Sequence, residues 1–196
     1  MISDILHPNI EPSPEEVQIA VLGQLKYVIE NELAELEHAV KERPVNAVAW
    51  IGRNLLELWV WTIYCTRSPE NARRFFDDAA RDALGALNLP DGMFTNDPNF
   101  SFKAARTEML EEAKQKGVEG LDSSYQRVSD AAKDIGKGEY YLAANKLYSK
   151  FAHPTALWVM TEQPVFEGFR KKLYDGGVSF GRSSRRYIDS FRQRSE

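Results

Sequence analysis

Apolar side chains recur at helical spacing along most of this chain. Between residues 13 and 43 they fall three or four positions apart, so that they share one face of a helix: Leu22, Leu25, Ile29, Leu33, Leu36 and Val40. Ser13 is a suitable N-cap and Pro14 suits the first helical position. Pro44 ends the periodic stretch. The pattern therefore predicts a long amphipathic helix that ends at about Arg43.

The stretch from Val45 to Cys65 is apolar on almost every face, and its only charges are Arg53 and Glu57. A helix with this pattern is typical of the centre of a bundle, where other helices cover every side. The stretch is long enough to cross a bilayer, but each charge near its middle would cost about 2.5 to 3.5 kcal/mol on insertion scales. We therefore expect a buried helix of a soluble protein and no membrane partner.

Amphipathic patterns predict further helices over residues 70–87, 102–116, 123–135, 139–152, 154–163 and 165–175. Gly176 and Gly177 are interpreted as a break before a basic segment. No stretch shows the alternation and β-branched enrichment of strands. The prediction is an all-α, single-domain bundle of about seven or eight helices around the central apolar helix 45–65. Its expected parts are a flexible leader 1–12, the bundle 13–180, and a basic C-terminal helix or tail 181–196.

Composition narrows the class of protein. The chain has 196 residues, of which 43% are hydrophobic and 28% charged, as in folded domains. A formal net charge of -4 argues against polyanion binding by the whole surface, although residues 182–196 carry five arginines. Cys65 is the only cysteine, so no intrachain disulfide and no thiolate zinc cluster can form. Without a recognisable secretory signal at the start, we expect a cytoplasmic protein.

A polar line crosses the central helix. At 100° per residue, five side chains fall on one side of it: Asn46, Trp50, Arg53, Glu57 and Tyr64. Arg53 and Glu57 are four residues apart and can form an ion pair. One interpretation is a structural pair that fixes helix register. The other is a pocket in which Arg53 meets an anionic ligand while Glu57 holds the arginine in place.

A second polar cluster lies between Asn145 and Pro154. Asn145 and Ser149 are one helical turn apart, Tyr148 is next to their face, and His153 stands at the break between two predicted helices. Histidine is the side chain suited to exchange a proton near neutral pH, which makes His153 the best candidate for a general base or a ligand. The alternative is a histidine that hydrogen-bonds a helix end.

These residues resemble a known pattern. Arg53 and Glu57 form R-x-x-x-E, and residues 148–154 form Y-S-x-x-x-H-P, which is similar to a family of uncharacterised, all-helical bacterial proteins. The resemblance covers about residues 20–160. It implies that Arg53, Glu57, Tyr148, Ser149 and His153 converge in space. It carries no activity with it.

The leading hypothesis for function is a non-catalytic binding or assembly module. In this hypothesis the polar side chains hold a small ligand or serve the structure: Arg53, Glu57, Asn145, Tyr148, Ser149 and His153. The aromatic stretches 50–64 and 157–166 could leave an exposed patch that drives formation of a homo-oligomer. Whether the protein is an enzyme stays open at this point.

The alternative is metal-independent cleavage of RNA. Ribonucleases of the HEPN type, which this chain resembles only loosely, place an arginine and a histidine at R-x(4 to 6)-H spacing. Lys146 and His153 have that interval, but lysine lacks the planar fork of arginine. Arg53 could supply the missing group from another helix, with His153 as the base, and RNA would then be a partner.

A metal centre is the least supported hypothesis. Ferritin-like sites need two E-x-x-H units, and this chain has one, Glu35 to His38, on the side away from the apolar stripe. We therefore expect no metal and no cofactor.

Overall fold

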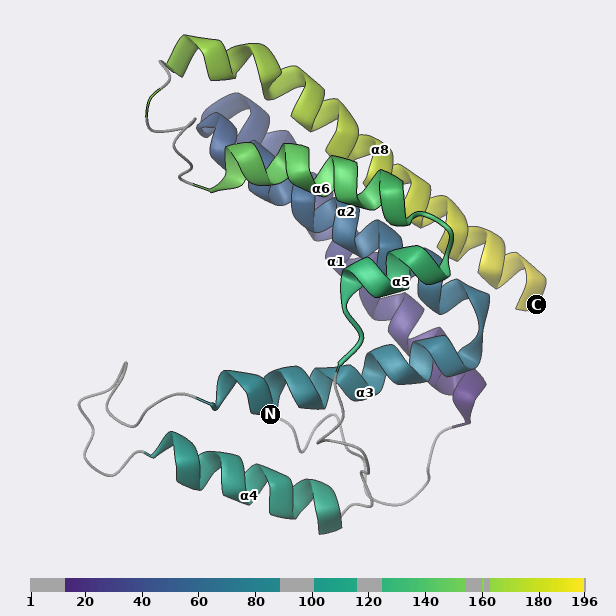
Figure 1. Cartoon of the computed structure of the whole chain (residues 1–196). Coiled ribbons are helices and arrows are strands. Elements are labelled where there is room, and N and C mark those ends of the chain that lie inside the picture. The colour runs from purple at the N-terminus through teal and green to yellow at the C-terminus, as the bar shows by residue number, and fades with distance from the viewer. Residues whose placement is uncertain (1–12, 89–100, 116–124, 154–159, 161–162, 196) are drawn as a thin grey trace.

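The computed structural model describes residues 13–88, 101–115, 125–153, 160 and 163–195 (Figure 1). These residues form seven α-helices and no strand, which confirms the all-α prediction. The helices are α1 (Pro14–Glu42), α2 (Val45–Arg67), α3 (Pro69–Ala86), α4 (Phe102–Gln115), α5 (Val128–Asp134), α6 (Gly138–Ala152) and α8 (Gln163–Ser195).

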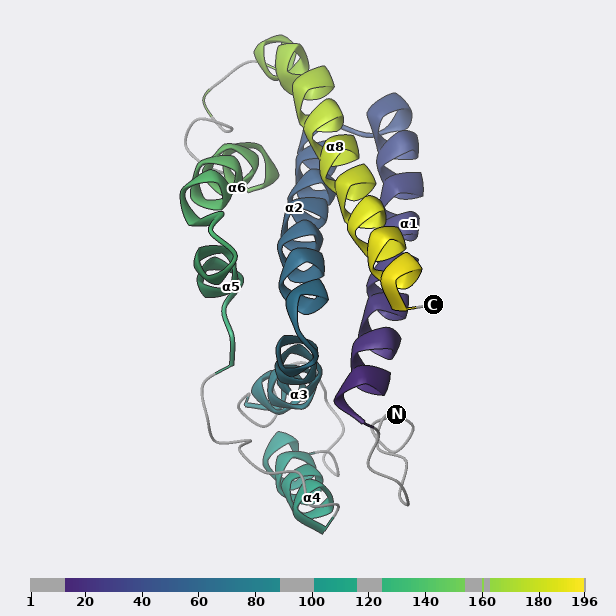
Figure 2. The ribbon, with the colours of Figure 1, turned by 90° about the vertical axis from the view of Figure 1, so that its right-hand side faces the viewer.

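Helix α2 is the centre of the bundle. It packs against α1, α3, α5, α6 and α8. In Figure 2, α5 and α6 lie on one side of α2, and α1 and α8 lie on the other. Its buried apolar side chains therefore face several neighbours at once: Val45, Val48, Leu55, Leu56 and Val60 have no exposed surface. Among the described helices, α2 included, none has an apolar stretch that could cross a membrane.

Local chemistry sets several helix ends where the sequence predicts them. The Ser13 hydroxyl accepts a hydrogen bond from the Glu16 N–H at 3.2 Å, and the Glu16 carboxylate accepts from the Ser13 N–H at 2.7 Å. This capping box satisfies two donors at the start of α1. Helix α6 ends at Ala152, because His153 precedes a proline and adopts extended backbone with φ -109° and ψ 151°.

The start of α5 differs from the prediction. Residues 125–127 are not helical, and α5 begins at Val128 instead of residue 123. The Gln126 N–H donates to Oδ2 of Asp78 in α3 at 2.9 Å, and both residues are buried. This tertiary bond satisfies the Gln126 N–H outside a helix. The helix predicted over 154–163 lies almost entirely outside the described residues.

The break expected at Gly176 and Gly177 is wrong, because α8 runs without interruption from Gln163 to Ser195. A Cβ on Gly176 would lie 2.5 Å from the Tyr148 hydroxyl, and one on Gly177 would lie 3.2 Å from the Cα of Gly52 in α2. The glycines thus let α8 approach α2 and α6 closely. That contact offsets the roughly 0.5 to 1 kcal/mol by which a helical glycine disfavours the fold. The basic segment 181–195 is consequently the last part of α8.

Cys65 gives a test of this packing. Its side chain is fully buried near the end of α2, and burial raises the pKa of its thiol. Because the thiolate is the reactive form, we expect native protein at pH 8 to react very slowly with a disulfide reagent such as DTNB. Protein unfolded in guanidinium should react at once. Full labelling of native protein at the rate of the unfolded chain would contradict the packing of α2.

Candidate functional site

Arg53 of α2 contacts one polar side chain in the middle of α6 and one at its end. Its Nε donates to Oδ1 of Asn145 at 2.9 Å and lies 3.2 Å from Oε1 of Glu57. Its Nη1 lies 3.0 Å from Nε2 of His153. We call Arg53, Glu57, Asn145 and His153 the Arg53 cluster. Two helices that are far apart in the sequence therefore meet at one guanidinium.

The local structure explains how these side chains come together. Arg53 and Glu57 share a face of α2 because they are four residues apart. His153 is the residue at which α6 ends, and its extended backbone places the ring beside α2. The edge of that ring meets the ring of Trp50, one helical turn before Arg53, with centroids 5.6 Å apart and an interplanar angle of 88°. Trp50 is 48% exposed, so the cluster opens to the surface beside it.

The hydrogen bonds fix the roles of the cluster's nitrogen atoms. Arginine can only donate, so Nε2 of His153 accepts in this contact and the ring proton resides on Nδ1. Oδ1 of Asn145 accepts, which leaves its Nδ2 as a donor. The Nε–H and one Nη1 N–H of the guanidinium are used in these contacts. The other Nη1 N–H and the Nη2 group have no acceptor among the described residues.

The cluster is only partly covered. The side chain of Arg53 is 26% exposed and that of Glu57 is 30% exposed. At this exposure their ion pair contributes about 1 kcal/mol or less, far below the value of a fully buried pair. About a quarter of the Arg53 side chain is therefore open to solvent.

Tyr141 is a buried side chain near Glu57 and Arg53. It was not among the site residues predicted from the sequence. It lies four residues before Asn145 on α6 and is buried. Burial raises the pKa of its phenol, and the Glu57 carboxylate adds to that effect. The available signal was the spacing of Tyr141, Asn145 and Tyr148, which is that of one helix face.

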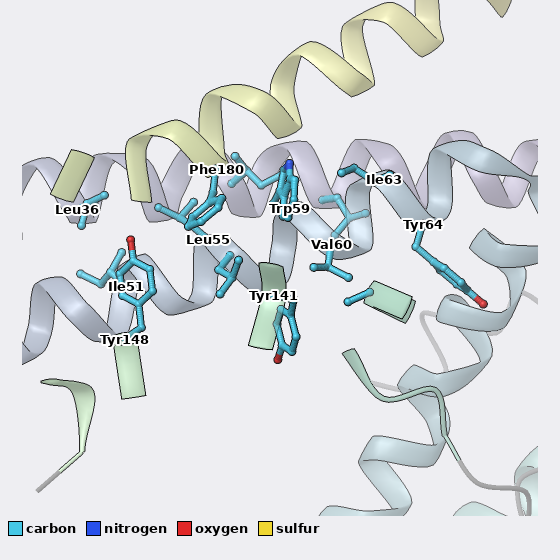
Figure 3. Close-up of a cluster of buried hydrophobic side chains, with 14 of the residues drawn as sticks. Leu36, Ile51, Leu55, Trp59, Val60, Ile63, Tyr64, Tyr141, Tyr148 and Phe180 are labelled. Carbon is cyan, nitrogen blue, oxygen red and sulfur yellow. The ribbon is translucent and has the colours of Figure 1, made fainter. Parts of the chain in front are cut away.

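The Tyr148 hydroxyl bonds α8 and none of the side chains of the Arg53 cluster. It donates to the backbone oxygen of Leu173 in α8 at 2.9 Å, and the Tyr148 ring is buried (Figure 3). Ser149 is half-buried, and its backbone oxygen accepts from the His153 N–H at 3.4 Å. Of the residues that the motif pattern was expected to bring together, Arg53, Glu57 and His153 meet.

The remaining members of the predicted polar line have different surroundings. Tyr64 is buried at the far end of α2, where its backbone oxygen accepts from Nδ2 of Asn71 in α3 at 3.0 Å. Oδ1 of Asn46 is buried and has no partner among the described atoms. Within the described residues, no three histidine, cysteine, aspartate or glutamate side chains are grouped so as to hold a metal ion.

The fold and the cluster together define a class: an all-helical bundle with a half-buried arginine cluster between its central helix and α6. The chain belongs to DUF5677, a family of unknown function, whose model matches residues 33–163. The matched region contains the whole Arg53 cluster. No curated protein and no solved structure matches the chain.

Proposed function

We propose that this protein is a helical binding module that receives an anionic group, a phosphate or a carboxylate, at the free edge of Arg53. One observation carries the proposal. The guanidinium is held by Glu57, Asn145 and His153, yet part of it is exposed and its Nη2 group has no protein acceptor in the described residues. A planar, pre-positioned fork of this kind matches the paired oxygens of carboxylate and phosphate.

The surrounding residues have distinct roles in this proposal. Glu57 and Asn145 orient Nε, so that the opposite edge of the guanidinium points to the ligand. His153 holds Nη1 through Nε2 and keeps its own Nδ1–H as a donor. The exposed ring of Trp50 gives an apolar surface beside the anion site. A purely structural ion pair would need no free guanidinium edge.

The proposal is tested by titrating the protein with inorganic phosphate and following the backbone amide resonances of α2 and α6 by NMR, together with the Nε–H resonance of Arg53 in the wild type. A charge-assisted hydrogen bond contributes about 1.5 to 3 kcal/mol, so Arg53→Met should weaken phosphate binding by about tenfold or more. Arg182→Met, which removes an exposed arginine on α8, is the matched control and should leave binding unchanged.

Stability is measured in the same variants. Because the Arg53 pair is partly exposed, we expect Arg53→Met to lower the unfolding free energy by about 1 kcal/mol or less. Absence of any phosphate-dependent shift in the wild type would overturn the proposal. A much larger fall in the unfolding free energy of Arg53→Met would indicate that the Arg53–Glu57 pair is structural.

A second candidate function is metal-independent cleavage of RNA, and one contact favours it. The guanidinium of Arg53 lies 3.0 Å from the ring of His153, so that a cation and a base are adjacent although they come from different helices. In such a reaction His153 would remove the proton of a ribose 2′-hydroxyl, which attacks the neighbouring phosphorus as the 5′-oxygen leaves. Arg53 would stabilise the charge on the phosphate.

RNA cleavage is the second candidate because the contact with Arg53 occupies the nitrogen that would have to act as the base. Nε2 of His153 accepts from Arg53, so its lone pair is not free for a substrate hydroxyl until that contact opens. The test is incubation of the protein with single-stranded RNA in chelator, beside His153→Ala and Arg53→Met. We expect no cleavage by any of the three. If the wild type cleaved RNA and both variants did not, the ribonuclease hypothesis would replace the binding-module proposal.

Assembly and location stay predictions. Large apolar side chains are exposed on α6 and beside the cluster, including Trp50, Tyr140, Leu142 and Leu147. Such residues support the homo-oligomer that the aromatic pattern predicts. A cytoplasmic location likewise remains an expectation.

A further inference from the structure

The connection between α5 and α6 borders a cavity of about 700 Å³, a size typical of small-molecule sites. Apolar side chains form one wall: Trp59 of α2 with Tyr140 and Leu142 of α6. Two lysines, two glycines and one glutamate line the rest: Lys133, Gly136, Lys137, Gly138 and Glu139. The cavity shares no residue with the Arg53 cluster and lies at the opposite end of α6.

Trp59 holds the aromatic wall in place, since it is only 8% exposed, whereas Tyr140 and Leu142 face the solvent. Nε1 of Trp59 donates to the Ser183 hydroxyl at 3.2 Å, and the Trp59 ring packs against Phe180 with centroids 5.5 Å apart (Figure 3). Tyr140 meets Trp59 with centroids 5.7 Å apart and an interplanar angle of 65°. Although it belongs to this cluster, Tyr140 is 56% exposed. The wall therefore offers a rigid aromatic surface to a planar ligand.

The opposite side of the cavity is cationic. The stem of Lys133 crosses the start of α6, where a Cβ on Gly138 would lie 2.9 Å from its Cγ, and its Nζ bonds Oδ1 of Asp130 at 2.9 Å. Within the described part of the chain, no carboxylate pairs with Lys137. Lys137 is also the N-cap residue of α6 and supplies no side-chain cap, so the positive end of the helix adds to its charge.

We propose that this cavity binds a small planar aromatic carboxylate, independently of the anion site at Arg53. The ring lies on the exposed ring of Tyr140, beside the small exposed part of Trp59, and the carboxylate pairs with Lys137. Glu139 lines the same cavity, so a second negative group on the ligand would be repelled. The site thus selects an aromatic body with a single negative charge.

The test compares two probes of the same shape, naphthalene-2-carboxylate and the neutral naphthalene-2-carboxamide, by isothermal titration calorimetry. We expect the wild type to bind the carboxylate about tenfold more tightly, because only the carboxylate makes a charge-assisted contact. In the Arg53→Met background, where the other anion site is absent, Lys137→Gln should abolish that preference without changing affinity for the carboxamide. Tyr140→Ala, which removes an exposed ring, should weaken binding of both probes.

Two control variants separate this site from the rest of the protein. Lys41→Gln removes an exposed lysine of α1 that does not line the cavity, and Arg53→Met removes the anion site. Lys41→Gln should bind the carboxylate as the wild type does, and Arg53→Met should keep the preference for the carboxylate over the carboxamide. No binding of the carboxylate, equal affinity for the two probes, or an unchanged preference when Lys137→Gln is added to Arg53→Met would each overturn the proposal. If Arg53→Met no longer bound naphthalene-2-carboxylate, the probe would be assigned to the Arg53 cluster and not to this cavity.

Discussion

Tyr148→Ala should lower the free energy of unfolding by about 3 to 5 kcal/mol, the range for removing a large aromatic side chain from a core. Tyr148 is only 3% exposed. Its ring lies against the backbone of Gly52 in α2, and its hydroxyl donates to the Leu173 oxygen in α8. This one side chain of α6 therefore joins three helices, and its loss leaves a cavity among all of them.

Chemical denaturation measures this effect, and the same helix supplies its control. Tyr140→Ala deletes an identical side chain that is mostly exposed, so it should cost about 1 kcal/mol or less. Tyr148→Phe keeps the ring and removes only the hydrogen bond to Leu173, which is worth about 0.5 to 1.5 kcal/mol. If Tyr148→Ala were no more harmful than Tyr140→Ala, the described packing of α6 on α2 and α8 would be incorrect.

Gly52→Ala should destabilise the protein by about 1 to 3 kcal/mol, although alanine favours helices. A Cβ at this position would lie 2.4 Å from Cε1 of Tyr148, which is closer than real atoms approach. The opposite neighbour is also close, since a Cβ on Gly177 would lie 3.2 Å from the Cα of Gly52. The added methyl group has no free space, so α2 and α6 must separate.

The chain offers matched controls for this substitution. Gly23 in α1 and Gly168 in α8 also lie inside helices, but a Cβ on either would meet nothing within 4 Å. Gly23→Ala and Gly168→Ala should therefore stabilise by about 0.5 to 1 kcal/mol, because alanine restricts the unfolded chain and favours the helix. In thermal unfolding, Gly52→Ala should lower the melting temperature, whereas Gly23→Ala and Gly168→Ala should raise it. A change of melting temperature in the same direction for all three variants would contradict the close contact at Gly52.

A double variant tests whether the two effects share one cause. In Tyr148→Ala the ring that blocks a Cβ on Gly52 is absent. Gly52→Ala should then cost much less than in the wild type, and the two losses should not add. Additive losses would indicate that the glycine acts through another neighbour.

Part of the candidate site could be predicted from spacing alone. Arg53 and Glu57 pair because residues four apart are neighbours on a helix, and His153 stands at the end of α6 because a proline follows it. Spacing alone could not predict the partners across helices, and only the resemblance to a family pattern implied that Arg53 and His153 converge. Asn145 and His153 are far from Arg53 in the sequence, and their contact depends on how α6 is rotated against α2.

Tyr148 shows the same limit. The motif places it beside Ser149 and five residues before His153, which implies a shared site, but neighbouring residues of a helix point about 100° apart. Its hydroxyl consequently reaches α8, whereas His153 reaches α2. Adjacency in a motif does not fix the direction of a side chain.

The sequence by itself determined the helical class, the central position of α2 and the ends that local chemistry sets, such as the capping box at Ser13. These features depend on residues within a few positions of one another. The tertiary structure alone decided that α8 continues through Gly176 and Gly177, that Arg53 bonds Asn145, and that the Tyr148 hydroxyl bonds α8. All three depend on atoms brought together from distant parts of the chain, where close packing and hydrogen bonds outweigh local preference.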